Sequence, residues 1–309
     1  MLHEITYPSF NERDKIYAWV YVPAARPKGV IQLVHGFGEH ARRYLHMISA
    51  FVEQDYIVCA DDHVGHGKTA VENDSWGDWG DKGFETMVED EKKLHDEVVK
   101  LYPDVPYFMF GHSMGSIITR QYMAKYGSDL TAATLCGTCG LFPGLRDDIK
   151  LLEQAEAAGL GDQADPEAGA KLLGWMFART GAPTIGNEWI CHDPYVQKDH
   201  AQDPFNAFTK PTPNRTYLYF LQMIEDVDSV EWAEKVPKEL PIYSIAGDQD
   251  PFGYYGEGVM RVSNWLTDTG HDVTTKLYSG KRHEIHNYRE IRDEVEEGIT
   301  DFFDACLDK

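Results

Sequence analysis

Apolar runs and amphipathic stretches alternate along most of this chain. Short runs rich in β-branched and aromatic residues predict strands at 16–22, 29–34, 56–60, 107–110, 131–136, 242–246 and 273–278. Apolar residues at helical spacing predict helices at 41–54, 84–101, 117–123, 255–266 and 293–307. Strands that alternate with helices form parallel sheets covered on both faces, so the pattern predicts an α/β fold. The first strand is expected to join the sheet antiparallel.

This alternation lapses between residues 141 and 230. Glycines and prolines divide the stretch into short helical pieces, expected at 147–158, 168–179 and 216–224. An insertion of helices into an alternating chain is typical of a cap over the catalytic face of a sheet. We therefore expect a core domain of residues 1–140 and 231–309 and a helical cap, or lid, of residues 141–230.

The charge of the chain narrows the classes of partner. Its 309 residues include 29 lysines and arginines against 51 acidic residues, a formal net charge of −22. Because a field of that sign repels phosphate, we expect no nucleic-acid partner. No apolar run approaches the ~20 residues that span a bilayer, so we expect no stable membrane insertion. The sequence makes no prediction of the oligomeric state.

Cysteine usage predicts a reducing environment. The five cysteines are an odd number at irregular spacing, unlike a disulfide framework. The N-terminus lacks the basic flank and apolar stretch of a signal peptide, so the protein is expected to be cytoplasmic. Cys136 and Cys139 have the spacing of a redox pair, but Cys136 falls inside a predicted buried strand. Redox thiolates are exposed, and we therefore expect no redox role for this pair.

One strand leads directly into a serine flanked by glycines. The segment Gly111-His112-Ser113-Met114-Gly115 lies between the predicted strand at 107–110 and the predicted helix that follows. Strand, G-x-S-x-G and helix in that order indicate a nucleophile elbow, in which the glycines leave room for a tight turn. A plain structural turn is the alternative. We predict that Ser113 is a nucleophile.

Two later loops offer the groups that a serine nucleophile requires. A serine hydroxyl needs a base to accept its proton, and the base needs an acid to orient it. After an elbow, the acid and then the histidine are expected in chain order. One strand-end loop carries Asp248 and Asp250, and the next carries His283 and His286. Because the ends of parallel strands meet at one sheet edge, both loops are expected beside Ser113. Within them we favour Asp250 over Asp248 and His283 over His286.

A glycine-rich turn predicts the second half of an oxyanion hole. His35-Gly36-Phe37-Gly38-Glu39-His40 follows the predicted strand at 29–34. Glycines here permit a sharp turn whose backbone N–H groups point into open space, as an anion requires. We predict that the N–H groups of Phe37 and Met114 are the donors. Chemistry of this kind requires no metal or organic cofactor.

The segment Asp61-Asp62-His63-Val64-Gly65-His66-Gly67 is dense in possible metal ligands. Transition-metal sites usually have further ligands at regular spacing, and none is evident. We therefore favour a hydrogen-bonded loop and expect no metal. In the expected cap, most large apolar residues should form its own core. Trp175, Trp189 and Met223 are candidates to line an acyl pocket.

Four motifs together resemble a known family: His35 to His40, Asp62 to Gly67, Gly111 to Gly115, and Gly280-Lys281-Arg282-His283-Glu284-Ile285. They are similar to the α/β-hydrolase branch that holds monoacylglycerol lipases, bacterial lysophospholipases and serine aminopeptidases. The resemblance implies a mostly parallel sheet with an inserted helical cap. It also implies Ser113 as nucleophile, Asp250 as acid and His283 as base, with Phe37 and Met114 as oxyanion donors. The substrate is then a small ester or a monoacyl lipid, cleaved through an acyl-enzyme.

Two other functions are compatible with the same sequence. An aminopeptidase or amidase would use the same three residues and would need an acidic cap residue, such as Glu188 or Asp193, to hold a substrate ammonium. A ligand receptor would keep the fold without the chemistry. We disfavour the receptor, because degenerate members usually lack a catalytic residue and all three candidates are present here.

Overall fold

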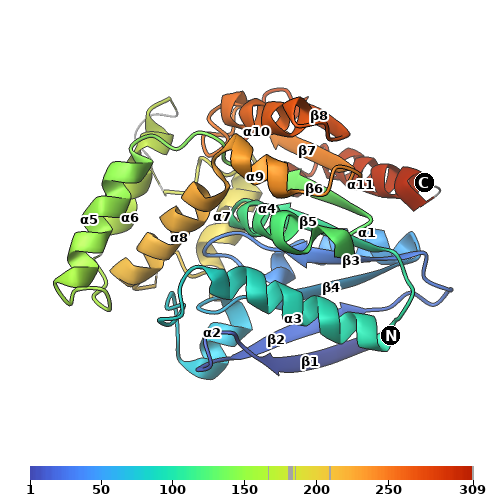
Figure 1. Cartoon of the computed structure of the whole chain (residues 1–309), viewed down its shortest axis with the longest axis horizontal. Helices are drawn as coiled ribbons and strands as arrows, with labels where there is room; N and C mark the ends of the chain where they lie inside the picture. Colours follow the sequence, from blue (N-terminus) through green and yellow to red (C-terminus); the bar gives the residue numbers. More distant parts are fainter. Residues whose placement is uncertain (166, 180–183, 185, 209, 308–309) are drawn as a thin grey trace.

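A mixed eight-stranded sheet forms the centre of the molecule (Figure 1). The computed structural model describes residues 1–165, 167–179, 184, 186–208 and 210–307. The strands follow the order β1-β2-β4-β3-β5-β6-β7-β8 across the sheet. Their bounds are β1 Leu2–Pro8, β2 Lys15–Tyr21, β3 Gly29–Val34, β4 Tyr56–Asp62, β5 Tyr107–His112, β6 Ala132–Cys136, β7 Ile242–Gly247 and β8 Val273–Tyr278.

The pairing of the strands confirms the α/β expectation. From β4 to β8 every neighbouring pair is parallel, whereas β1 and β2 join antiparallel at one edge. The central strands β3 and β5 are buried along their whole length, which explains why they form continuous apolar runs in the sequence. The edge strand β1 escaped prediction, because most of its residues are exposed or half-buried and its sequence is mixed.

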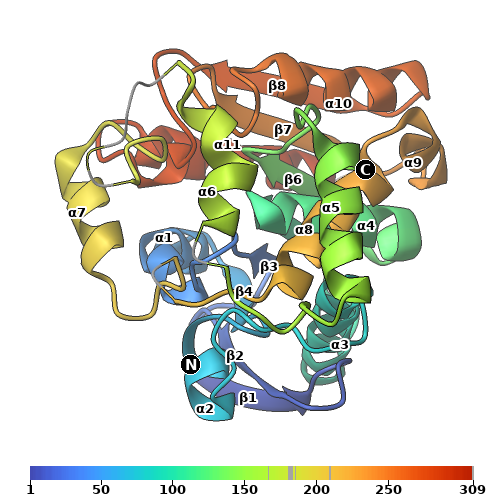
Figure 2. The same cartoon turned by 90° about the vertical axis from the view of Figure 1, so that its left-hand side faces the viewer.

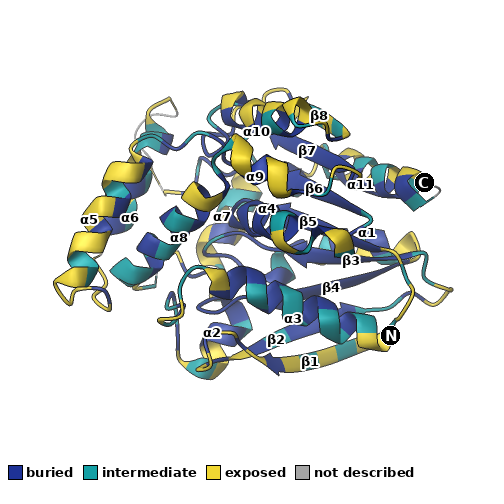
Figure 3. Ribbon diagram, viewed as in Figure 1, coloured by how far each residue is buried: buried dark blue, intermediate teal, exposed yellow. Residues whose placement is uncertain are grey.

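Helices cover both faces of the sheet. α3 (Glu85–Leu101), α4 (Met114–Tyr126) and α10 (Glu257–Asp268) pack on one face. α1 (Leu45–Glu53) and α11 (Arg292–Leu307) pack on the other, as Figure 1 shows. Each face of the sheet therefore has its own apolar core. Figure 3 shows these layers as a buried sheet within helices whose outer sides are exposed.

Residues 141–230, called here the inserted segment, lie between β6 and β7. They form α5 (Leu145–Ala157), α6 (Ala168–Leu173), α7 (Pro194–Gln202) and α8 (Asn214–Val227), and α9 (Val230–Lys235) leads back to the sheet. Figures 1 and 2 show α5, α6 and α8 lying across one end of the sheet. None of the helices in the described part of the chain is both long and apolar enough to cross a membrane.

Several predicted helices differ in their details. The helix expected at 41–54 begins as a 3-10 turn, Ala41–Tyr44, before α1. The helix expected at 168–179 is α6 followed by a 3-10 turn, Gly174–Phe177. The short helices α2 (Gly67–Asn73), α7 and α9 were not predicted. Two of them carry a local signal: Asp193 caps α7 with Pro194 at its first position, and Ser229 caps α9.

Candidate active site

Ser113 occupies a strained turn between β5 and α4. Its backbone has φ 56° and ψ −122°, a conformation that residues other than glycine rarely adopt. The flanking glycines are sterically required: a Cβ on Gly115 would lie 2.0 Å from the carbonyl oxygen of Val34, and one on Gly111 would lie 2.2 Å from Thr119 Oγ1. The turn is fastened to the sheet because Ser113 N–H donates to Cys136 O at 2.9 Å. This geometry is that of a nucleophile elbow.

The structure pairs His283 with Asp250 among the candidates for base and acid. His283 Nδ1 lies 2.9 Å from Asp250 Oδ2, and both side chains are buried. Asp250 Oδ1 also accepts from Phe252 N–H at 2.9 Å. Burial opposes the charged ring, but the Asp250 carboxylate raises the pKa of His283 above its usual value. A carboxylate held in this way fixes the ring tautomer and leaves Nε2 for other partners.

The two competing candidates have other contacts. Asp248 Oδ1 accepts from Gly280 N–H at 2.7 Å, which holds together the turns that follow β7 and β8. His286 is fully buried, and its ring stacks on Tyr44 with centroids 4.9 Å apart. Neither residue takes the place of Asp250 or His283.

The His283 ring lies beside the cavity that Ser113 lines. Trp189 and Phe252 also line this cavity, and their rings lie 4.8 and 5.5 Å from that of His283. Gly137, the residue after β6, approaches both partners of the pair: a Cβ there would lie 3.2 Å from His283 Cε1 and 3.4 Å from Asp250 Oδ2. His283 Nε2 is buried and has no hydrogen-bond partner among the residues that the structure describes. This nitrogen is thus free to receive a proton.

The glycine-rich turn after β3 runs directly past the serine. A Cβ on Gly36 would lie 2.9 Å from Ser113 Cβ, so only glycine permits this approach. Phe37 follows Gly36 and lines the same cavity as Ser113, while Met114 opens α4. Of the two backbone positions expected to supply oxyanion donors, Met114 therefore follows Ser113 in sequence, and Phe37 is brought near it by the fold.

A buried ionic network lies behind the site. Arg43 binds Glu284 through both guanidinium Nη atoms, at 2.6 and 2.9 Å, and Glu39 at 2.8 Å. Glu39 Oε1 accepts from Gly36 N–H and from Tyr44 Oη–H, both at 2.6 Å. Burial opposes both charged carboxylates, but His112 and then Arg43 hold the pKa of Glu39 below its usual range, and Arg43 does so for Glu284. The network joins the Gly36 turn to the residue that follows His283.

Sequence reasoning missed this network, although one local signal exists. Glu39 and Arg43 are four residues apart, the spacing of a helical ion pair. Nothing local marks Glu284 as the third member, because 241 positions separate it from Arg43.

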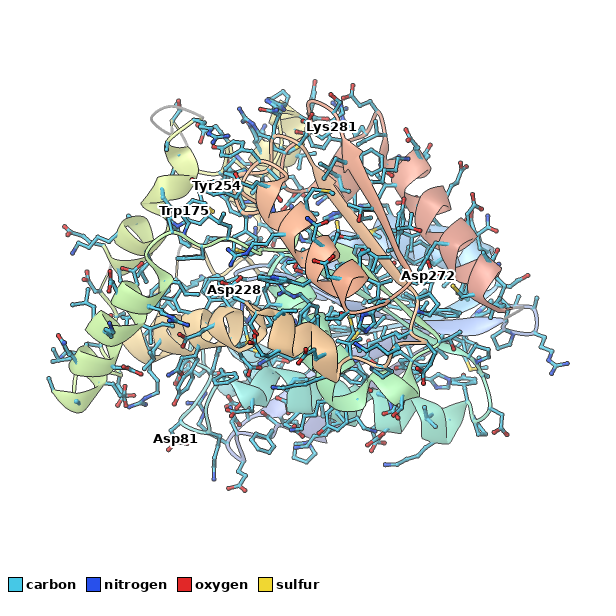
Figure 4. The ribbon with its side chains drawn as sticks, turned by 45° about the horizontal axis from the view of Figure 1, so that its top comes forward. Asp81, Trp175, Asp228, Tyr254, Asp272 and Lys281 are labelled. Atoms are coloured by element: carbon cyan, nitrogen blue, oxygen red, sulfur yellow. The ribbon has the colours of Figure 1, made fainter. Side chains whose placement is uncertain are left out.

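The cavity beside Ser113 is apolar and narrow. Its walls are Phe37, Leu173, Met176, Trp189, Phe208, Tyr217, Phe220 and Phe252. Of the residues predicted to line a pocket, Trp189 does so. Trp175 and Met223 are not among the described residues of the wall: Trp175 packs against Phe142 and near Tyr254 (Figure 4), and Met223 is fully buried in the core. Aromatic residues that the sequence did not single out form much of the wall instead.

The acid- and histidine-rich loop after β4 is held by hydrogen bonds, as expected. His63 Nδ1 lies 3.0 Å from Asp61 and 3.2 Å from Glu91, and its Nε2 donates to His35 O at 3.1 Å. The ring thus donates a hydrogen bond through Nε2, and its Nδ1 lies at ion-pair distance from both acids. Burial opposes this charged ring, but Asp61 and Glu91 raise the pKa of His63 well above its usual value. The mutual contacts of these three buried side chains fit the hydrogen-bonded loop that the sequence favours.

The two cysteines with redox spacing lack the character of a redox pair. Both are buried free thiols. Burial raises the pKa of Cys139 to about 12 and that of Cys136 well above its ordinary value. A thiol that resists ionisation reacts slowly in disulfide exchange.

A serine elbow at the carboxyl edge of a mostly parallel sheet, with helices inserted before the last strands, defines the α/β-hydrolase class. Within that class, the sequence profile of the family "Serine aminopeptidase, S33" matches residues 25–290. The chain belongs to this family.

Relatives and solved structures agree with that membership. Mouse monoglyceride lipase is 38% identical over 274 residues, covering 88% of this chain and 80% of that enzyme. Mycolicibacterium smegmatis monoacylglycerol lipase is 26% identical over 272 residues, covering 87% of this chain and 85% of that enzyme. A thermostable carboxyl esterase from Bacillus coagulans, solved with glycerol, has a TM-score of 0.97 and 54% identity, with 99% of each chain covered. The chain is an ester-hydrolysing α/β-hydrolase of the monoglyceride-lipase-like branch.

Proposed function

We propose that this enzyme hydrolyses esters of monoacyl lipids, monoacylglycerols foremost, with Ser113 as nucleophile, His283 as base and Asp250 as the acid that orients it. The observation that carries this proposal is the buried 2.9 Å contact between His283 and Asp250, beside the cavity that Ser113 lines. The names of the relatives support the substrate class, since mouse monoglyceride lipase and the Bacillus coagulans carboxyl esterase both cleave carboxylic esters by name.

The proposed reaction has two halves. Ser113 Oγ attacks the ester carbonyl while His283 Nε2 accepts its proton, and the resulting oxyanion is held by the N–H groups of Phe37 and Met114. One such donor commonly contributes about 3 kcal/mol to transition-state stabilisation. His283 then returns the proton to the leaving alcohol, and the acyl group stays on Ser113. Water, deprotonated by the same ring, attacks the acyl-enzyme. The ring then gives this proton to Ser113 Oγ as the bond to the acyl group breaks and the fatty acid is released.

In this proposal the inserted segment, residues 141–230, acts as a cap that selects the acyl chain. Leu173, Met176 and Phe220 of this segment line the same cavity as Ser113. An alkyl chain placed against them would be stabilised by ~0.8 kcal/mol for each buried methylene. We further propose a cytoplasmic location, supported by the five buried free cysteines.

An aminopeptidase function finds less support. The acids expected to grip a substrate ammonium have other partners: Asp193 pairs with Arg289 at 2.6 Å and caps α7, and Glu188 accepts from the N–H groups of Thr184 and Gly186. Neither acid is among the described residues that line the Ser113 cavity.

Labelling and turnover test the proposal together. A fluorophosphonate probe should label the native enzyme, and Ser113→Ala should abolish both labelling and hydrolysis of 1-decanoylglycerol. Ser75→Ala is the matched control, because Ser75 is also buried and its hydroxyl has no partner among the described residues. Labelling that persists in Ser113→Ala would contradict the assigned nucleophile. Turnover of aminoacyl anilides well above that of esters would favour the aminopeptidase instead.

A further inference from the structure

Arg120 is a fully buried arginine without a carboxylate partner at salt-bridge distance in the described part of the chain. It lies on α4, seven positions after Ser113. Its guanidinium carbon lies 4.4 Å from the centroid of the Trp232 ring, and Trp232 Nε1–H donates back to Arg120 O at 2.7 Å. Burial lowers the pKa of Arg120 to about 10, so the side chain stays charged at neutral pH. A buried charge of this kind is costly unless hydrogen bonds satisfy it.

The partners of Arg120 are the two ends of the inserted segment. Nη1 donates to Cys139 O at 2.6 Å, just before the segment begins. Nη2 donates to Val227 O, at the last residue of α8. The neighbouring Gln121 adds a contact to Asp226 Oδ2 at 3.0 Å. One side chain on the helix of the nucleophile thus holds both crossings between core and insertion.

The two crossings differ in how firmly the core holds them otherwise. At the first, Gly140 is wedged against α10, since a Cβ there would lie 2.3 Å from Gly258 O. At the second, α8 ends at Val227 and the chain turns at Asp228 before α9 (Figure 4). The Asp228 carboxylate adds only a longer-range attraction to Arg120. At the second crossing, the side chains of α4 that bind the end of α8 are those of Arg120 and Gln121, and Val227 is buried in the core.

The geometry connects this contact to the cavity. Phe220 lines the cavity with Ser113 and precedes Val227 by seven positions on α8, just as Ser113 precedes Arg120 by seven positions. Seven helical residues span about 10 Å. α4 packs against α8. Arg120 therefore links α4 and α8 at one place, and about two turns away Ser113 and Phe220 line the same cavity.

We propose that Arg120 is a positioning residue, which sets α8 relative to the helix of Ser113 and so fixes the distance between the nucleophile and the wall that receives the acyl chain. The proposal rests on the function proposed above. Arginine suits this task because its planar fork presents two N–H groups to two carbonyl oxygens at once, whereas lysine offers a single point charge. The guanidinium needs no substrate contact to act in this way.

Acyl-chain length separates positioning from general stability. An acetyl group is too short to use α8, whereas a decanoyl group has to lie along it. Arg120→Ala should therefore lower kcat/KM for 4-nitrophenyl decanoate by about 20-fold and that for 4-nitrophenyl acetate by less than about threefold. Methylguanidinium at ~10 mM should restore the decanoate activity of Arg120→Ala, because it can refill the vacated fork site. Arg120→Lys, which keeps the charge but replaces the planar fork with a single nitrogen, should fall between the two enzymes.

The matched control is Arg215→Met. Arg215 also lies on α8, but its partners Glu156 and Asp162 are both inside the inserted segment. This variant should lower the activity toward both esters by the same factor. Should Arg120→Ala fail to fold, Arg120→Lys carries the same comparison of esters.

Two results would overturn the proposal. The first is an Arg120 variant whose ratio of decanoate to acetate activity equals that of the native enzyme. The second concerns amide hydrogen exchange. We expect exchange in residues 221–227 to become faster in Arg120→Ala and exchange in α5 to stay the same, so an unchanged rate in residues 221–227 would contradict the proposal. The exchange measurement needs no substrate. A native enzyme inactive on every ester would therefore refute the proposed function. The exchange rates of the Arg120 variant would still test whether Arg120 positions α8.

Discussion

The two sides of the Ser113 cavity are built from different interactions. On the core side, charged and polar groups fix the loops: Arg43 joins Glu39 to Glu284, and Asp250 holds His283. On the side of the inserted segment, the wall is made of aliphatic and aromatic side chains. Directional contacts hold groups to the tolerance that proton transfer needs, whereas apolar packing accepts substitution. The comparison indicates that chemistry and substrate choice can vary separately in this enzyme.

The largest expected effect comes from breaking the polar side at the proposed acid. Asp250→Asn should lower kcat by about 10³ to 10⁴-fold, because the amide can favour the wrong tautomer of His283. Asp248→Asn is the control, since Asp248 only bridges a turn, and it should change kcat less than about twofold. Steady-state kinetics with one ester measure both. Equal losses in the two variants would show that the loop, rather than the acid, carries the effect.

The ionic network should dominate the stability of the core side. Arg43→Met leaves the buried carboxylates of Glu39 and Glu284 without their cation and should lower the free energy of unfolding by about 3–5 kcal/mol. Arg289→Met breaks an exposed pair with Asp193 and should cost less than about 1 kcal/mol. Urea denaturation of the two variants gives the comparison directly. If Arg43→Met lowered the free energy of unfolding no more than Arg289→Met does, the ionic network would not be the main stabilising feature of the core side.

On the apolar side, substitution should change preference more than rate. Phe220→Leu enlarges the cavity. It should raise the ratio of kcat/KM for long-chain esters to kcat/KM for short-chain esters by roughly three- to tenfold. Phe302→Leu, on α11 and against Tyr243, is the matched control and should leave the ratio unchanged. A series of 4-nitrophenyl esters measures it. If kcat/KM fell by the same factor for every ester in the series, the apolar side would affect rate and not preference, and the contrast with the polar side would be wrong.

The smallest expected effect is a pH dependence. The pKa of Glu284 is lowered in the folded protein, chiefly by Arg43 acting against burial. Its stabilising contribution is therefore complete above the ordinary glutamate pKa of 4.5 and is lost as the pH falls below it. The difference in unfolding free energy between the native enzyme and Glu284→Gln should thus be smaller at pH 3.5 than at pH 6, by about 1 kcal/mol. A difference that grows on acidification would contradict this assignment.

Some parts of this site could be predicted from sequence because their signal is local or topological. The elbow at Ser113 needs only a strand, two glycines and a helix in order. The pairing of Asp250 with His283 follows from the rule that parallel strands end at one edge. Strand positions were predicted from apolar runs, which burial on both faces of a parallel sheet requires.

Other parts depend on packing between segments that are distant in the sequence. No local or periodic sequence pattern marks such contacts. Trp175 and Trp189 look alike in the sequence, yet only Trp189 reaches the cavity, because Trp175 packs on Phe142 instead. Glu284 and Arg120 read as ordinary charged residues until the fold buries them. Side chains of this kind gain their roles from partners more than 100 positions away or, for Arg120, from the two ends of an insertion.

The turn that presents Ser113 carries a consequence for thermal resistance. Its positive φ costs a non-glycine residue roughly 1–3 kcal/mol, which the surrounding fold has to absorb. Replacing the serine by glycine would relax the backbone while removing the hydroxyl, whereas alanine would remove the hydroxyl and keep the distortion. Ser113→Gly should therefore melt at a higher temperature than Ser113→Ala. The native protein is thus less resistant to heat than its fold would allow, because the strained turn holds the Ser113 hydroxyl in place.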